Sequence, residues 1–208
     1  MESKNEQNIT RAYALAKERY STVGVDTDEV LSRLKNIPIS IHCWQGDDVT
    51  GFEGIGDGPD GGIQFTGNYP GRARTPEELR SDLDKALGLI PGTHRLNLHA
   101  IYAEDRDAGT DRDRLEPAHF SQWIAWARDK GMGLDFNPTF FAHPRAGSGF
   151  TLSSPDPAVR EFWIEHGRAC RRIAEQMGRE LGTPSVTNFW IPDRSEERRV
   201  GKECATGC

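Results

Sequence analysis

The sequence predicts an α/β protein built on a parallel β-sheet, because short apolar segments alternate with helical patterns along the chain. Each apolar segment runs into polar and aromatic residues. In parallel sheets such residues gather at the carboxyl ends of the strands, where ligands bind. The four segments are Ile37–Trp44, Arg95–Tyr102, Met132–Pro138 and Val186–Asp193. The residues expected to meet at these ends are His42, Trp44, His99, Asn137 and Trp190.

Two helices are expected before the first strand. Ala12, Leu15 and Ala16 share one face of the first helix. A second, short helix is expected to begin at Asp26, because Asp26 and Glu29 have the spacing of a capping box, in which each side chain satisfies a backbone N–H of the first turn.

Helical spacing also fills the intervals between the later strands. Thr75–Glu78 combines a capping Thr, a Pro at the first helical position and two acids, so it predicts a helix that ends before Pro91. Apolar residues repeat at helical spacing from Phe120 to Ala127. A long helix is expected from about Pro157 to the glycine at position 182.

Two long segments between these elements predict loops. The glycine-rich stretch from Thr50 to Arg74 is expected to be a lid, a subunit contact or a plain surface loop. The stretch from Ala103 to Glu116 carries many charges and predicts a loop without an apolar face.

Composition narrows the class of protein. The chain has 208 residues, 36% hydrophobic and 28% charged, with a formal net charge of -6. These values predict a soluble globular protein without the excess of positive charge that nucleic-acid binding requires. No stretch approaches the roughly 20 apolar residues of a membrane span, and the first residues lack the apolar run of a secretory signal. We therefore expect no nucleic-acid partner, no membrane partner, a cytoplasmic location and reduced cysteines.

His99 is the sharpest single candidate for chemistry. The alternation in Leu96–His99 places a titratable ring at the end of an otherwise buried strand. A neutral His there can orient a hydroxyl group, bind a metal or move a proton. The alternative is a hydrogen-bonded core residue.

Trp44 and Trp190 stand at the ends of two expected strands, where indole rings suit the apolar faces of a sugar. Each could instead be a packing residue. Their equivalent positions, with His99 between them in the sequence, favour a polyol pocket.

The carboxylates do not form a complete site. Asp47, Asp48, Asp135 and Asp193 could act as acid, base or metal ligand, or could cap loops and hydrogen-bond within the sheet. Glu116 and His119 have a Glu-x-x-His spacing, but they stand at a helix start. No nucleophile elbow and no pair of Glu residues at strand ends indicates a hydrolase or a glycosidase. We expect His119, His143 and His166 to be structural or solvated.

The sequences of several segments resemble the N-terminal half of the L-rhamnose isomerase family. In this chain the resemblance runs from about residue 10 to Asp193. The segments that carry this resemblance are Ile41–Val49, Thr66–Gly71, Arg95–Tyr102, Leu134–Pro138, Leu181–Val186 and Trp190–Asp193.

The resemblance implies the N-terminal half of a (β/α)8 TIM barrel with extra N-terminal helices. It implies a cytoplasmic homotetramer that interconverts L-rhamnose and L-rhamnulose with two divalent cations, often Mn²⁺. It further implies that His99 contacts the substrate, that Trp190 and Trp44 form pocket walls, and that the aromatic loop from Phe136 to Phe141 belongs to the sugar-binding rim.

The chain also departs from the family. The family's metal ligands and catalytic Lys follow the strand that matches Val186–Trp190, so we expect no catalytic and no metal-binding residue in this chain. Residues 194–208 resemble a translated sequencing adapter and are expected to be an unrelated, disordered tail after a partial domain at 1–193. The fragment is therefore expected to be inactive alone.

Overall fold

The computed structural model describes residues 3–43, 51–53, 71–107 and 109–193. The chain divides into two compact units, Met1–Ile39 and Ser40–Cys208. The helices that precede the first strand therefore form a unit of their own, and each unit is described by itself.

The first unit contains helices α1 (Lys4–Ser21) and α2 (Thr27–Leu34). Helix α1 begins with a capping box between Ser3 and Glu6, which was not expected. At the start of α2, Asp26 accepts hydrogen bonds from the backbone N–H groups of Asp28 and Glu29, at 2.9 and 3.1 Å. The predicted Asp26 cap is thus present and satisfies the first turn of α2.

Polar contacts join the two helices of this unit. The hydroxyl of Tyr13 lies 3.0 Å from that of Thr27 and donates to Asp28 at 2.5 Å. Lys17 pairs with the same Asp28. Neither helix contains a buried residue, so the pair is held by these side-chain contacts rather than by a core.

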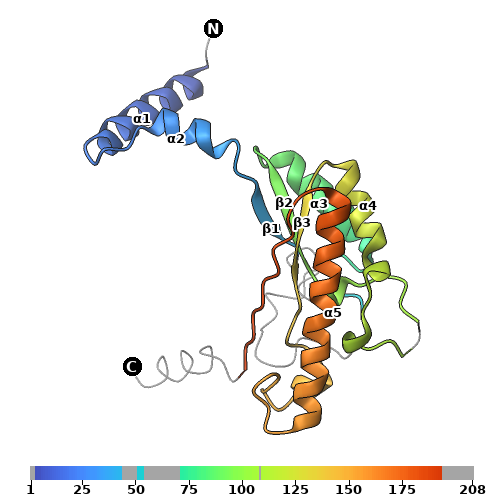
Figure 1. Ribbon diagram of the computed structural model, residues 1–208. Helices are drawn as coiled ribbons and strands as arrows, with labels where there is room; N and C mark the ends of the chain where they lie inside the picture. Colours follow the sequence, from blue (N-terminus) through green and yellow to red (C-terminus); the bar gives the residue numbers. More distant parts are fainter. Residues whose placement is uncertain (1–2, 44–50, 54–70, 108, 194–208) are drawn as a thin grey trace. The chain divides into compact units, whose positions relative to one another are not determined.

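The second unit is built on a three-stranded sheet in the order β1 (Ile39–His42), β2 (His94–His99) and β3 (Gly133–Asn137) (Figure 1). Strands β2 and β3 are parallel, with a register from Arg95 opposite Gly133 to His99 opposite Asn137. The predicted α/β class with a parallel sheet is confirmed. The first strand was expected to be buried, but β1 is an edge strand whose residues are exposed or half-buried.

The fourth expected strand forms only a single parallel bridge, between Phe136 and Thr187. The backbone N–H of Phe136 donates to the carbonyl of Val186 at 2.9 Å, and that of Asn188 donates to the carbonyl of Phe136 at 2.8 Å. The backbone then turns tightly, because the N–H of Trp190 donates to the carbonyl of Asn188 at 3.2 Å. This turn ends the pairing with β3 and corrects the prediction of a full strand.

The two faces of the β2–β3 pair differ in polarity, because successive side chains alternate across a strand. One face is apolar and fully buried, and helices α3 (Pro76–Leu89), α4 (Ser121–Asp129) and α5 (Pro157–Leu181) contribute to the same core cluster. The sheet residues of this face are Leu96, Leu98, Leu134 and Phe136, each 0% exposed. The opposite face is polar and carries the candidate site.

The helices of this unit begin and end where the sequence predicts. The hydroxyl of Thr75 accepts from the backbone N–H of Glu78 at 3.2 Å at the start of α3. Helix α5 begins after Asp156, whose side chain accepts from the N–H of Ala158 at 2.8 Å, and ends at Gly182 in a left-handed conformation with φ of 64°. Although α5 has 25 residues, no helix in the described part of the chain combines the length and apolarity needed to cross a membrane.

The charged segment after β2 differs from expectation. The 3-10 helix η1 (Ala100–Tyr102) precedes it, a second, η2 (Arg112–Arg114), lies within it, and a third, η3 (Pro117–Phe120), follows it and leads into α4. The segment also buries Leu115 and the whole side chain of Arg112. The predicted loop without an apolar face is therefore wrong for this segment, which packs against α5.

Candidate functional site

The polar face of the sheet has two ends with different chemistry. Arg95 lies near the amino end of β2 and contacts Asp135 of β3, and His99 and Asn137 lie at the carboxyl ends of the two strands. Asn97 lies opposite Asp135 and places its Nδ2 3.2 Å from Nδ1 of His42.

Asp135 is the centre of a hydrogen-bond network at the amino end. It accepts from Nε and Nη2 of Arg95 at 2.9 to 3.2 Å, from the hydroxyl of Ser40 at 2.6 Å and from the backbone N–H of Val186 at 2.9 Å. Burial acts to raise the pKa of Asp135, but these hydrogen bonds and the Arg95 charge outweigh it and hold the pKa below its usual value. A carboxylate with all its partners in the protein ties strands together, which favours the structural alternative for Asp135.

His99 is fully buried at the carboxyl end of β2, and its Nδ1 lies 3.3 Å from the hydroxyl of Thr139. That hydroxyl is also 3.4 Å from the carbonyl of Asn137, to which it can only donate. When the hydroxyl donates to that carbonyl, the Thr139 oxygen accepts from Nδ1–H of His99, and in this tautomer Nε2 carries no proton. Burial, followed by the charges of His42 and Arg112, lowers the pKa of His99 to about 3. His99 is thus a neutral imidazole at physiological pH.

Aromatic rings surround His99. The rings of Tyr102 and Phe141 lie 6.3 and 6.4 Å from it, both edge-on, and His42 lies 6.3 Å away. Trp190 packs against Phe141 with ring centroids 5.5 Å apart. The structure therefore brings His99 and Trp190 into one aromatic cluster through Phe141, as their places at the expected strand ends predict.

Phe136 does not belong to this cluster. It points to the apolar face of β3, is 0% exposed, and packs edge-to-face on Phe120 at 5.0 Å. The structure places it in the core between sheet and helices, because its neighbours Asp135 and Asn137 occupy the polar face. The sugar contact that the family resemblance implies for Phe136 stays a prediction. The buried position of the ring on the helix-covered face does not favour it. Trp44, Asp47 and Asp48 lie outside the described residues.

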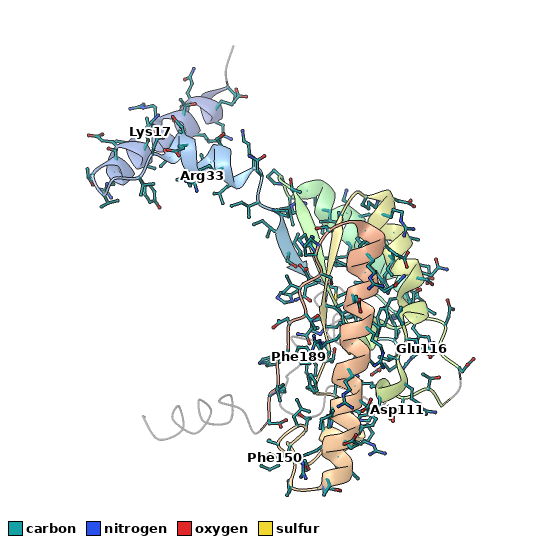
Figure 2. The ribbon with its side chains drawn as sticks, viewed as in Figure 1. Lys17, Arg33, Asp111, Glu116, Phe150 and Phe189 are labelled. Carbon is teal, nitrogen blue, oxygen red and sulfur yellow. The ribbon has the colours of Figure 1, made fainter. Side chains whose placement is uncertain are left out.

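The remaining candidates have structural partners. Asp193 accepts from the backbone N–H and hydroxyl groups of Thr151 and Ser153, at 2.5 to 2.8 Å, and so anchors that loop. His119 closes a cap with Glu116. His166, buried in α5, contacts the carbonyl oxygens of Arg112 and Pro138, and its pKa is lowered to about 4, chiefly by burial. In Figure 2, Phe189 lies to the left of α5, and Glu116 and Asp111 lie to its right.

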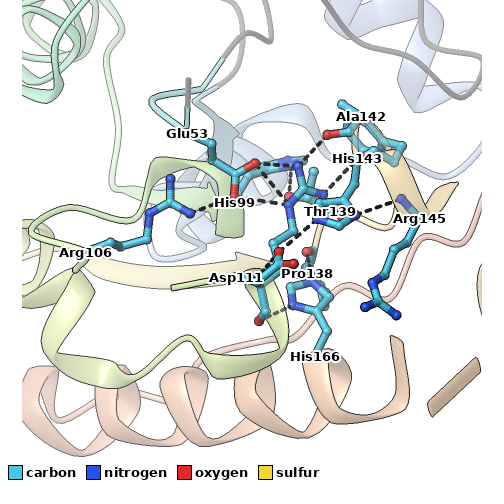
Figure 3. A network of polar contacts seen from close by, with 12 residues as sticks. Glu53, His99, Arg106, Asp111, Pro138, Thr139, Ala142, His143, Arg145 and His166 are labelled. Atoms are coloured by element: carbon cyan, nitrogen blue, oxygen red, sulfur yellow. Dashed lines mark hydrogen bonds and ion pairs between the residues drawn. The ribbon is translucent and has the colours of Figure 1, made fainter. Parts of the chain in front are cut away.

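The residues that hold the carboxyl end together are not among the predicted ones. Arg112 is completely buried and pairs with Glu53, whose side chain is 4% exposed, at 2.6 Å. Arg106 contacts the same carboxylate at 3.3 Å. Figure 3 shows Arg106 joined to Glu53 on one side of the network and Ala142 on the other side. Nothing in the sequence separates Arg112 from the other charges around it, and Glu53 lies in a glycine-rich stretch that predicts only a loop.

A cleft of about 860 Å³ opens beside this ion-pair network. His143 lines it and is held by Asp111, whose carboxylate lies 2.9 Å from Nε2, and by the backbone N–H of Arg145, which donates to Nδ1 at 3.1 Å. Burial and then the Arg112 charge lower the pKa of His143 against the opposing pull of Asp111. The carboxylates lining the cleft are those of Glu53, Glu77, Glu104, Asp105, Asp107 and Asp111.

These carboxylates do not converge as metal ligands. Within the part of the chain that the structure describes, no group of three or more His, Cys, Asp or Glu side chains is arranged to hold a cation. A divalent cation needs several convergent oxygen or nitrogen ligands. The described residues therefore do not fit the two cations implied for the family.

Comparison with known proteins identifies the family. The family model for L-rhamnose isomerase (RhaA) matches residues 7–204, and so continues past Asp193 into the expected tail. The chain is 57% identical over 194 residues to an L-rhamnose isomerase of Mannheimia succiniciproducens, covering 93% of this chain and 46% of that protein. It is 55% identical over 195 residues to an L-rhamnose isomerase of Cronobacter sakazakii, covering 94% and 46%.

A third relative agrees. An L-rhamnose isomerase of Listeria monocytogenes serotype 4a is 56% identical over 188 residues, covering 90% of this chain and 44% of that protein. The chain thus spans about half the length of the curated relatives it matches. The family match covers nearly all of the described residues, including β2, β3, His99 and Trp190. This chain belongs to the L-rhamnose isomerase family.

Proposed function

We propose that this chain supplies part of the sugar pocket of an L-rhamnose isomerase, which interconverts L-rhamnose and L-rhamnulose. The observation that carries the proposal is the neutral, buried His99 inside an aromatic cluster at the carboxyl ends of the strands. Family membership supplies the reaction class.

The chemistry of the cluster suits a polyol. A nitrogen without a proton accepts a hydrogen bond from a sugar hydroxyl, and the contact of Thr139 with Nδ1 would make Nε2 of His99 that nitrogen. Aromatic faces such as those of Trp190 and Phe141 pack on the apolar C–H faces of a sugar ring or chain. His99 would orient one hydroxyl while the aromatic walls exclude water from it.

A metal ion is part of the proposed function, although the described residues offer no set of ligands for it. A divalent cation such as Mn²⁺ polarises the carbonyl and hydroxyl groups of the sugar during isomerisation. Since the described residues provide no ligand set, we propose that the chain alone does not turn over sugar. A cytoplasmic homotetramer is proposed for the complete enzyme, as the family resemblance implies.

An isomerisation assay and a binding assay test the proposal together. The purified 208-residue chain is incubated with L-rhamnose and Mn²⁺, and L-rhamnulose is measured; turnover would contradict the proposed inactivity. Calorimetric titration with L-rhamnose should show weak binding that His99→Asn abolishes. His94→Gln changes a His at the other end of the same strand and should leave binding unchanged. No binding by the wild-type chain would refute a pocket formed by these residues.

A second candidate is a carbohydrate-binding piece without catalysis. It is favoured by the combination of an aromatic cluster with no convergent metal ligands among the described residues. Binding of L-rhamnose that is equal with and without Mn²⁺ supports it, whereas binding that requires Mn²⁺ supports the isomerase pocket. Preferential binding of a different aldose would indicate another metal-dependent sugar isomerase.

A further inference from the structure

Arg112 uses every nitrogen of its guanidinium. Nη1 donates to the carbonyl oxygens of Thr139 and Phe141 at 2.7 and 2.6 Å. Nη2 donates to the carbonyl of Ala142 at 2.7 Å and to Glu53 at 2.6 Å, and Nε donates to Glu53 at 3.0 and 3.1 Å. A planar guanidinium has five donors in a fixed fork, so only Arg satisfies this arrangement.

The segment that Arg112 holds has an unusual backbone. Thr139 and Ala142 adopt φ of 62° and 50°, in the left-handed region that residues with a Cβ rarely occupy. A β-branched residue such as Thr139 is a clear outlier there. Such conformations persist only where the surrounding contacts impose them. The carbonyls of both residues accept from the guanidinium, and the N–H of Thr139 also donates to Oδ1 of Asn137 at 2.8 Å.

This turn carries two of the neighbours of His99. The hydroxyl of Thr139 contacts Nδ1 of His99, and the ring of Phe141 packs edge-on against the imidazole and also against Trp190. One guanidinium therefore binds the backbone of Thr139, whose hydroxyl contacts His99, and that of Phe141, whose ring contacts both His99 and Trp190.

We infer that Arg112 is a positioning residue, which fixes the ring orientation and tautomer of His99 by holding the turn from Thr139 to Ala142. Its effect on sugar chemistry rests on the proposed function, whereas its effect on the geometry of His99 does not. The competing view is that Arg112 and Glu53 form a buried ion pair that contributes only to stability. The two views differ in what happens to His99 in a folded variant.

Arg112→Lys separates the two views, because Lys keeps the positive charge but has three donors on one atom and no planar fork. The matched control is Arg95→Lys. Arg95 also binds a carboxylate, that of Asp135, and also donates to carbonyl oxygens, those of Leu134 and Pro184, but at the opposite end of the strands.

The measurement is NMR of ¹⁵N-labelled imidazole nitrogens in the full 208-residue chain without sugar, with His99 assigned by His99→Asn. The charged and titratable groups that face His99 among the described residues are His42 from β1, Tyr102 from η1 and Arg112 from η2. Wild-type His99 should show one protonated Nδ1 and one unprotonated Nε2 with no titration between about pH 5 and 8.

In Arg112→Lys, His99 should populate both tautomers and its pKa should rise by about one unit or more, because Thr139 no longer fixes Nδ1 and water reaches the ring. Arg95→Lys should leave the His99 signals unchanged. Unchanged His99 signals in a folded Arg112→Lys chain, or equal changes in both variants, would overturn the inference.

Thr139→Val keeps the inference testable if Arg112→Lys does not fold. Val keeps the shape and the backbone carbonyl but removes the hydroxyl, so the ion pair stays and the tautomer of His99 should still become mixed. A single unchanged tautomer in Thr139→Val would equally overturn the inference. Addition of L-rhamnose to the wild-type chain is a separate measurement, and lack of sugar binding would refute the proposed pocket without altering the result for Arg112.

Discussion

Asp135→Asn tests how strongly the amino end of the polar face holds the strands together. The change removes the negative charge while keeping the shape of the side chain. It leaves the Arg95 cation, which is 14% exposed, without its carboxylate. Arg95, Ser40 and the N–H of Val186 all donate to Asp135. The amide NH₂ of Asn is itself a donor, so it cannot accept from these groups.

The expected loss in the free energy of unfolding is about 3 kcal/mol, since removing one partner of a buried ion pair costs about 3 to 5 kcal/mol. The lower end applies because Arg95 keeps its hydrogen bonds to the hydroxyl of Thr183 and the carbonyl of Pro184, and because Asn still offers one acceptor oxygen.

Urea unfolding of the full chain, followed by circular dichroism, measures this loss. Asp84→Asn is the matched control, because Asp84 pairs with Lys130 at 2.9 Å where the two side chains are 41% and 37% exposed. Exposed pairs contribute up to about 1 kcal/mol. If Asp135→Asn cost no more than Asp84→Asn, the role of Asp135 in organising the sheet would be refuted.

The effect of Asp135 depends on pH in a defined direction. Its pKa in the folded chain lies below the ordinary value of 3.8, so its stabilisation is complete above that value. It is lost as the pH falls through the folded-state pKa, where the wild-type carboxylate takes up a proton. The stability difference between wild type and Asp135→Asn should therefore shrink in acid and stay constant between about pH 5 and 7.

Three further predictions concern the core and its glycines. Phe136→Ala should lower the free energy of unfolding by about 3 to 5 kcal/mol, because its ring is fully buried on Phe120; a cost under about 1 kcal/mol in urea unfolding would contradict its core position. Gly133→Ala should lower the melting temperature, because a Cβ there would overlap the Arg95 guanidinium. Gly88→Ala in α3 places a Cβ with nothing within 4 Å and should raise the free energy of unfolding by about 0.5 to 1 kcal/mol. If both changes stabilised or both destabilised the chain, this reasoning would be refuted. Cys170, whose pKa is raised by complete burial, should resist alkylation at about pH 8 until the chain unfolds, and rapid labelling of the native chain by mass spectrometry would show that the thiol is accessible.

The regular elements could be predicted because local rules determine them. The Thr75 cap, the Asp26 cap and the left-handed Gly182 each follow from side-chain chemistry within a few residues. The parallel pairing of β2 with β3 follows from strands separated by a helix. Apolar alternation is consistent with the burial of Leu98 and Phe136 on the helix-covered face, whereas the resemblance had implied a sugar contact for Phe136.

The site could be predicted only in part. Because strand ends mark ligand sites in parallel sheets, the sequence predicts that His99 and Trp190 lie together, and the structure places both in one aromatic cluster. Arg112 and Glu53 could not be found, because a buried ion pair between two loops has no periodicity. The loss of the fourth strand after Asn188 was also beyond reach, since it depends on a turn in which Phe189 packs on Phe140 and Trp190 on Phe141.

The contacts of Arg112 also bear on the order in which the chain assembles. Glu53 precedes it by 59 residues, and the accepting carbonyls follow it by 27 to 30 residues. In the unfolded chain the guanidinium is hydrated, and it gives up that water only when its distant acceptors are already in place. We therefore expect the Arg112 centre, which must release this water, to close after the β2–β3 ladder, whose apolar face carries no charge. On unfolding the same centre opens first, so its amide protons should exchange with solvent before those of Leu96 and Leu98.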